Sequence, residues 1–309
     1  MIQIKELESY KNYGRVLSIA NGVIECFVTL DCGPRVIRFS FVGEKNIFNS
    51  TREELGVLGG DDFENFFGKD KKWHSYGGHR IWTSPESFPE TYYPDNDPVE
   101  YQKTESGAIF TPPAETENGV QKSLEIKMDA DDANMQVIMN VKNITDKPME
   151  FSIWGISVCD KDGTLFVPMN DNDTGLLHNR NISVWSYTDL SDKRIKFGKK
   201  YAIIKQERDG EPLKLGFDIS KGKAYYKLGD KLFLKTFNAN HGTAVYPDGN
   251  CSFESYTSQN FLEVESLGEL KEVLPGETST NCEGWSLFRV DENAPVCCDD
   301  CIEALLEKL

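Results

Sequence analysis

Apolar and polar residues alternate with a period of two along most of the chain. Clear examples are QKSLEIKM at residues 121–128, MEFSIWGISV at 149–158 and FLEVESL at 261–267. Because successive side chains of a β-strand point to opposite faces, this period indicates strands with one buried face. Turn-forming pairs such as Asn21-Gly22 and Asp162-Gly163 separate such segments, and they favour hairpin connections. We therefore predict an all-β fold, a large antiparallel β-sandwich.

Helix is expected in only two places. Residues 53–68, EELGVLGGDDFENFFG, hold one short helical segment, and the tail DDCIEALLEKL at 299–309 begins with an aspartate N-cap. Apolar residues recur in this tail at helical spacing, so we expect a short C-terminal helix that docks on a sheet. They are Ile302, Leu305, Leu306 and Leu309. No repeat or Gly/Ser linker divides the chain, which favours a single domain over residues 1–309.

The chain is acidic, with 34 basic and 50 acidic residues and a formal net charge of -16. Such a charge repels phosphate backbones and anionic lipids, so we expect neither a nucleic acid nor a membrane as partner. The first residues lack the basic and apolar regions of a secretory signal, and no apolar run reaches the roughly 20 residues of a membrane span. We predict a cytoplasmic protein and leave monomer and homodimer open.

Eight cysteines are spread over the chain, and in the cytoplasm they are expected to stay reduced. Cys297, Cys298 and Cys301 lie close together near the end and suggest a soft-metal site. A tetrahedral zinc site needs four ligands, and no further Cys or His lies at a suitable spacing. We therefore expect no metal. The sequence motifs of nucleotide-binding loops, zinc proteases and serine hydrolases are also missing from the sequence, and we expect no cofactor.

The stretch WHSYGGHRIWTSPESFPETYYPDNDPV, residues 73–99, resembles a long functional connection between strands. It offers aromatic faces for a sugar ring and polar groups for its hydroxyls, namely Trp73, Trp82 and Tyr93 together with Arg80 and Asp95. Gly77 and Gly78 are expected to let the backbone approach a ligand closely. This mixture favours a carbohydrate as ligand. The alternative is that the aromatic residues pack under a loop and that Arg80 pairs with an acid.

Glu263 and Glu265 lie two positions apart, so they face the same side of a sheet. Two buried carboxylates would raise the pKa of one of them and supply a general base. Spacing alone favours a solvated pair on an outer face. His241, in a loop at residues 238–250, offers an imidazole that titrates near neutral pH, although a loop histidine is more often only exposed.

These segments together resemble the galactose mutarotase-like, or aldose epimerase-like, superfamily. The likeness is carried by DCGPRVIRFSFVGEKNIF ending near Asn46, by GGHRIW around Arg80, and by LEVES followed by LPGET and EGWSLF. It implies one large antiparallel β-supersandwich, a small-molecule carbohydrate as partner, Arg80 in the cleft and Glu263 as the catalytic base. Nearly the whole chain is similar to a branch known mainly as a domain of unknown function.

Mutarotation needs a base for the anomeric hydroxyl and an acid for the ring oxygen. The family uses a glutamate and a histidine, but Trp154 stands at the position of that histidine, and a second family histidine has no counterpart in VEYQKTESGAIFTPP. His79 or His74 is then the candidate acid, with Trp154 as a stacking platform. We predict a sugar-binding protein that interconverts anomers, with Glu263 as base and His79 as acid.

Two other functions are compatible with the same residues. The first alternative is a non-catalytic carbohydrate or sugar-phosphate binding module, in which the cleft has lost the mutarotase histidines. A lyase or hydrolase is the weaker one, because a fold alone does not fix the reaction.

Overall fold

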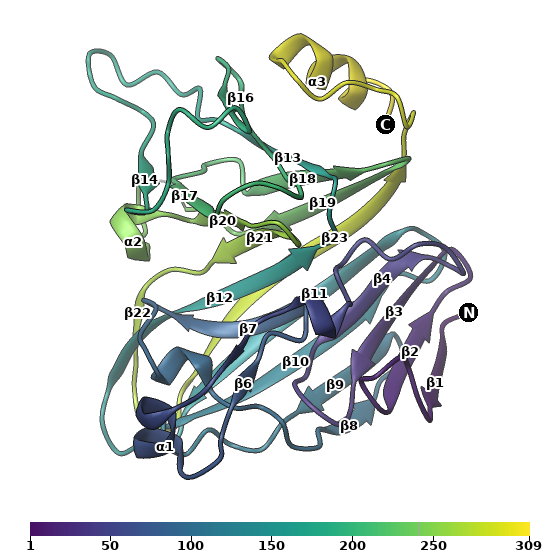
Figure 1. The fold of residues 1–309 in the computed structure, drawn as a ribbon, viewed down its shortest axis with the longest axis vertical. Helices are drawn as coiled ribbons and strands as arrows, with labels where there is room; N and C mark the ends of the chain where they lie inside the picture. Colours follow the sequence, from purple (N-terminus) through teal and green to yellow (C-terminus); the bar gives the residue numbers. More distant parts are fainter. Residues whose placement is uncertain (241) are drawn as a thin grey trace.

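The computed structural model describes residues 1–240 and 242–309, which form two large antiparallel β-sheets (Figure 1). In spatial order the first sheet contains β1 (Gln3–Leu7), β2 (Val16–Ala20), β3 (Ile24–Thr29), β4 (Val36–Phe41), β7 (Gly78–Ser84), β12 (Met149–Cys159), β21 (Leu262–Leu267), β20 (Phe253–Thr257), β17 (Leu213–Phe217) and β14 (Ile182–Val184). The short strand β22 (Lys271–Val273) pairs with one end of β12. The predicted all-β fold is confirmed.

The second sheet has ten strands. Their order is β15 (Ile195–Phe197), β16 (Tyr201–Lys205), β13 (Thr164–Pro168), β18 (Lys223–Leu228), β19 (Lys231–Phe237), β23 (Thr278–Arg289), β11 (Asn134–Asn143), β10 (Val120–Met128), β9 (Gly107–Thr111) and β8 (Glu100–Lys103). A separate two-stranded ribbon joins β5 (Val57–Leu58) to β6 (Trp73–His74).

One hydrophobic core lies between the two large sheets. In β10 the burial of the side chains alternates as the sequence predicts. Side chains at even positions are buried, and those at odd positions, such as Gln121 and Ser123, are half-buried. At the centre of the core the rings of Phe39 and Phe48 pack against Phe233 and Trp285 from the second sheet, with centroids 5.2 to 5.9 Å apart. Aromatic rings from both sheets therefore hold the sandwich together.

Residues 73–99 are not one long connection. Residues Gly78–Ser84 form β7, which lies in the first sheet between β4 and β12. Gly77 and Gly78 have φ angles of 76° and 64°. A Cβ atom at Gly77 would lie 2.3 Å from the backbone oxygen of Asn49, and one at Gly78 would lie 2.4 Å from that of Val36. In this structure these two glycines therefore allow close approach of neighbouring protein backbone.

Helices are few, as expected (Figure 1). They are α1 (Asp61–Phe67), α2 (Pro247–Asn250), α3 (Asp299–Leu306) and the 3-10 turns η1 (Arg52–Glu54) and η2 (Glu90–Tyr92). In the view of Figure 1, α1 lies at the bottom of the molecule, α3 at the top and α2 at the left, near β14. The N-cap of α3 is Cys298, not the expected aspartate. Ile302 and Leu305 of α3 are buried against the second sheet, which confirms the docked tail. Of the helices that the structure describes, none has the length and apolar character needed to cross a membrane.

Candidate functional site

A pocket of about 280 Å³ opens on the face of the first sheet that is turned away from the second sheet. We call it the outer-face pocket. Its lining comes from five neighbouring strands and from the loops around them, and includes Trp73, Arg80, Trp82, Trp154, Lys214, Tyr256 and Glu263. Strands β7, β12, β21, β20 and β17 are consecutive in the sheet, so residues far apart in the sequence meet on one surface.

Arg80 and Glu263 form an ion pair at the bottom of this pocket. Arg80 lies on β7 and Glu263 on β21, with β12 between them, and Arg80 Nη2 lies 3.1 Å from Glu263 Oε1. The guanidinium also lies 4.2 Å from the ring centroid of Trp82. Among the residues that the structure describes, Nε and Nη1 of Arg80 have no hydrogen-bond partner. Within that part of the chain, two nitrogens of a charged group are therefore buried without a hydrogen-bond partner.

Burial sets the protonation of Glu263. It raises the pKa of the Glu263 carboxyl to about 7, because the desolvated carboxylate is penalised more than the nearby Arg80 guanidinium stabilises it. The negative charge of Glu265 acts in the same direction as burial. A carboxyl with a pKa near 7 exchanges protons readily at neutral pH, which is what a general base requires. The sequence alternative of two solvated carboxylates is wrong, since Glu263 and Glu265 are both buried.

Lys214 and two glutamates form a second charged group beside the first. Lys214 Nζ lies 2.7 Å from Glu254 Oε2 and 3.6 Å from Glu265 Oε2. Burial lowers the pKa of Lys214, but the carboxylates of Glu265 and Glu254 outweigh it, and the net pKa is raised. Burial raises the pKa of Glu254 to about 9. Burial thus outweighs the attraction of Lys214 at Glu254, while the two acids together raise the pKa of Lys214.

Trp154 joins the charged groups to the aromatic wall. Its Nε1 donates a hydrogen bond to Glu265 Oε2 at 3.0 Å, and Lys214 Nζ lies 4.4 Å from its ring centroid. The Trp154 ring packs edge to face on Trp82, with centroids 5.6 Å apart. Phe63 of α1 belongs to the same buried cluster. These contacts hold Trp154 on one side of the pocket.

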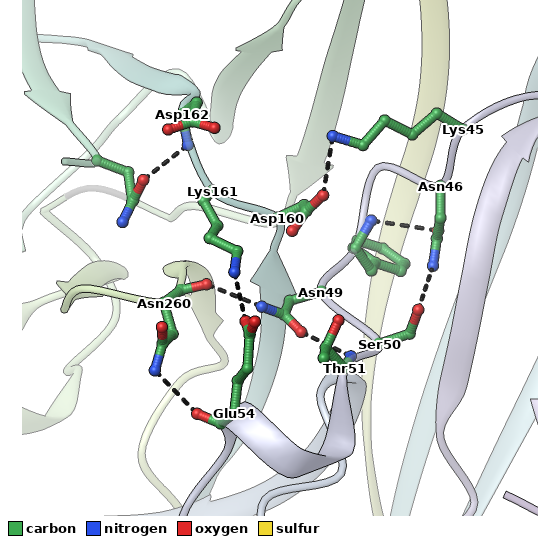
Figure 2. A network of polar contacts seen from close by, with 12 residues as sticks. Lys45, Asn46, Asn49, Ser50, Thr51, Glu54, Asp160, Lys161, Asp162 and Asn260 are labelled. Carbon is green, nitrogen blue, oxygen red and sulfur yellow. Dashed lines mark hydrogen bonds and ion pairs between the residues drawn. The ribbon is translucent and has the colours of Figure 1, made fainter. Parts of the chain in front are cut away.

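A polar network joins the loop after β4 to the loop before β21 (Figure 2). Asn49 Nδ2 donates to the backbone oxygen of Asn260 at 2.8 Å, and Asn260 Nδ2 donates to the backbone oxygen of Glu54 at 2.9 Å. Two residues that line the pocket are close along the chain, since Phe261 follows Asn260 and Gly56 is two positions after Glu54. The network therefore holds two loops that contribute to the pocket.

Five of the predicted residues meet in this pocket, and they are Trp73, Arg80, Trp82, Trp154 and Glu263. His79 lies elsewhere. Because it is next to Arg80 on the same strand, its side chain points to the opposite face, where Nδ1 lies 3.0 Å from Ser157 Oγ and the ring packs on Trp285. Burial holds the pKa of His79 well below its usual range. The expectation that His79 shares a cleft with Arg80 is wrong.

The remaining predicted residues are also outside the outer-face pocket. Asp95 forms an ion pair with buried Arg35, and together with Tyr93 it lines a separate small hollow of about 30 Å³. His74 is half-buried, and its ring packs at 5.4 Å on that of Tyr76. His241 lies outside the described residues. Asp95 therefore orients Arg35 in this structure and does not reach the pocket that contains Arg80.

Sequence reasoning missed Lys214, Tyr256 and Glu86, which also line the pocket. Lys214 had a readable signal, because it is one charged residue in the otherwise apolar strand LKLGF, all of which is buried. A buried lysine needs a charged partner. The sequence did not say which one, because Glu254 and Glu265 lie on strands that follow some 40 residues or more later along the chain.

The fold has solved relatives at low sequence identity. A galactose mutarotase-like protein from Clostridium acetobutylicum is 12% identical, with a TM-score of 0.55 over 93% of this chain and 99% of that one. A galactose mutarotase-like protein from Lactobacillus casei is 12% identical, with a TM-score of 0.55 over 88% of this chain and 100% of that one. The chain has the galactose mutarotase-like fold.

The same fold is found in the Slr1438 protein from Synechocystis sp. PCC 6803, which is 13% identical, with a TM-score of 0.55 over 93% of this chain and 96% of that one. No protein-family model and no curated protein matches the chain. At this level of identity the galactose mutarotase-like likeness establishes the architecture. The reaction has to be argued from the outer-face pocket.

Proposed function

We propose that the outer-face pocket binds a carbohydrate and that Glu263 acts on its anomeric hydroxyl. The observation that carries the proposal is the Arg80–Glu263 pair, 3.1 Å apart and buried under aromatic side chains. Aromatic rings stack on the apolar face of a sugar, while fixed charged donors and acceptors bind its hydroxyls. Trp82 and Trp73 supply the rings, and the Arg80 guanidinium, which lines the pocket, supplies the charged donor.

Glu263 is proposed as the general base. In its deprotonated form the carboxylate takes the proton of the anomeric hydroxyl, and the bond between the anomeric carbon and the ring oxygen breaks. Charged Lys214, which lines the same pocket, is proposed to give its proton to the ring oxygen, and ring closure on the other face reverses both proton transfers. The two neighbours of the same fold from Clostridium acetobutylicum and Lactobacillus casei are described as galactose mutarotase-like proteins, which is compatible with this role.

The second candidate is a carbohydrate-binding module without turnover. It is favoured by one specific observation, the position of His79 on the far side of β7. Among the described residues, no histidine lines the outer-face pocket. If the ring oxygen receives no proton from the protein, the pocket binds a sugar and leaves its anomers to interconvert at the rate in water.

The experiment measures anomer exchange by NMR and ligand-induced thermal stabilisation for one panel of neutral sugars, sugar acids and sugar phosphates. We expect wild type to accelerate exchange for at least one member of the panel, and Glu263→Gln to lose this acceleration by roughly 100-fold, the lower range for a general base. Glu272→Gln is the matched control, because Glu272 is exposed on β22.

The two readouts separate the two candidates. Stabilisation of wild type and of Glu263→Gln without any acceleration would assign a binding module, because mass action requires affinity only. Arg80→Ala should abolish stabilisation in either case. If no sugar of the panel stabilises or is turned over by wild type, the carbohydrate proposal is wrong.

A further inference from the structure

The strongest unexplained cluster of reactive groups lies at the start of α3, far along the chain from the outer-face pocket. The sulfur atoms of Cys297, Cys298 and Cys301 all lie within 4.8 Å of one another, and Cys297 Sγ lies 3.6 Å from Cys301 Sγ. We call these residues the thiol cluster. Cys297 and Cys298 are exposed and Cys301 is partly exposed, so the cluster is open to solvent.

The spacing of the sulfurs fits one shared ion. Thiolates bind a d10 metal at about 2.3 Å, which places the sulfurs of one ion about 3.8 to 4.0 Å apart. The separation of 3.6 Å and the upper bound of 4.8 Å bracket that value. A shift of a few tenths of an ångström in each side chain would therefore complete the coordination.

The helix that carries the cluster is firmly held. Ile302 and Leu305 are buried in a hydrophobic cluster on the second sheet. The Asp299 carboxylate accepts hydrogen bonds from the backbone nitrogens of Lys199, Lys200 and Tyr201, at 2.8 to 3.2 Å. Asp299 lies between Cys298 and Cys301, so its anchoring fixes the backbone of the cluster. A fixed backbone reduces the entropy lost when a ligand orders the side chains.

A backbone donor also faces the thiol cluster. Cys298 is the N-cap of α3, and its sulfur accepts a hydrogen bond from the backbone nitrogen of Cys301 at 3.4 Å. This contact orients the Cys298 sulfur toward the other two sulfurs.

We propose that the thiol cluster binds one Cu(I) ion through the three sulfurs of Cys297, Cys298 and Cys301. Soft thiolates select soft metals, and three sulfurs complete a trigonal site for Cu(I). Zinc would need a fourth ligand, and within the described part of the chain the group contains these three residues. We expected no metal from the sequence because tetrahedral zinc needs four ligands. That requirement does not apply to Cu(I), which three sulfurs can coordinate in a trigonal site.

The test uses the full chain, reduced and then freed of reductant under anaerobic conditions. Cu(I) is titrated against a chromogenic Cu(I) chelator, and we expect one ion per chain. Cys297→Ser and Cys301→Ser should each weaken the measured affinity by at least about tenfold, as the loss of a ligand exceeds the usual effect of losing a supporting contact. Cys282→Ser is the matched control, because Cys282 is an exposed cysteine on β23 and should bind as wild type does.

Thiol counting gives an independent readout. Four of the eight cysteines are buried, and the others are Cys282 and the thiol cluster. We expect four fast-reacting thiols in the native metal-free chain and one after Cu(I) is added. Protection of fewer than three thiols, equal Cu(I) affinity in Cys297→Ser, or tighter retention of Zn²⁺ than of Cu(I) would overturn the proposal.

Discussion

At the scale of single residues, the main feature of the outer-face pocket is that burial raises the pKa of Glu263. The carboxyl has an ordinary pKa of 4.5 and a pKa of about 7 in the folded chain. The folded state therefore holds the proton more tightly than the unfolded state does. Folding is favoured by this group at low pH, and the contribution is lost as pH rises from about 4.5 through about 7.

This difference makes a prediction about pH. Glu263→Gln keeps the shape of the protonated side chain and cannot ionise. We expect wild type and the variant to have similar free energies of unfolding at pH 4, below the ordinary pKa of the carboxyl. Above pH 7 wild type should fall behind the variant by on the order of 3 kcal/mol, since one pKa unit corresponds to about 1.4 kcal/mol. Urea unfolding of both proteins across this range is the measurement. If the free energy of unfolding of wild type instead rose relative to that of the variant with rising pH, the attraction of Arg80 for the Glu263 carboxylate would outweigh the penalty of burial.

At the scale of elements, β7 shows why the sequence predicted the strands better than the site. Nearly all of GHRIWTS is buried, including both faces of the strand. In GHRIWTS two polar residues are followed by two apolar residues, so this segment lacks the period of two and reads as a connection. That error placed His79 and Arg80 in one loop, although neighbours on a strand point apart. The prediction that Glu263 and Glu265 share one face is correct, because side chains two positions apart point to the same face in any β-strand.

The entry of β7 into the sheet gives a prediction at the same scale. Gly78 and Gly43 both have positive φ, 64° and 74°. A Cβ at Gly78 would meet the Val36 backbone oxygen at 2.4 Å, whereas one at Gly43 would have nothing within 4 Å. Gly43→Ala should cost about 1 kcal/mol for the left-handed conformation alone. Gly78→Ala should cost at least about 2 kcal/mol more, since backbone must move. Equal midpoints in urea would contradict the crowding argument.

At the scale of the whole molecule, a buried charge connects the two sheets. Lys235 on β19 donates from Nζ to the backbone oxygens of Gly155 and Val264, at 3.1 and 2.8 Å, and both oxygens belong to the first sheet. Its Nζ also lies 3.0 Å from Glu283 Oε1 on β23. Neither side chain is exposed. The backbone of the outer-face pocket strands β12 and β21 is therefore held from behind by one ammonium group.

Removing the Lys235 ammonium group should lower the free energy of unfolding by an amount that depends on whether Glu283 is present. Lys235→Met leaves Glu283 as an unpaired buried charge, and we expect a loss of about 3–5 kcal/mol in the free energy of unfolding. Adding Glu283→Gln removes the charge, so the double variant should lose less than the sum of the single variants by at least about 1 kcal/mol. Lys221→Met, which breaks an exposed pair with Asp171, should change stability by no more than about 0.5 kcal/mol. Additive losses in a urea double-mutant cycle would show that Lys235 acts through its backbone bonds alone, because only the ion pair makes its effect depend on Glu283.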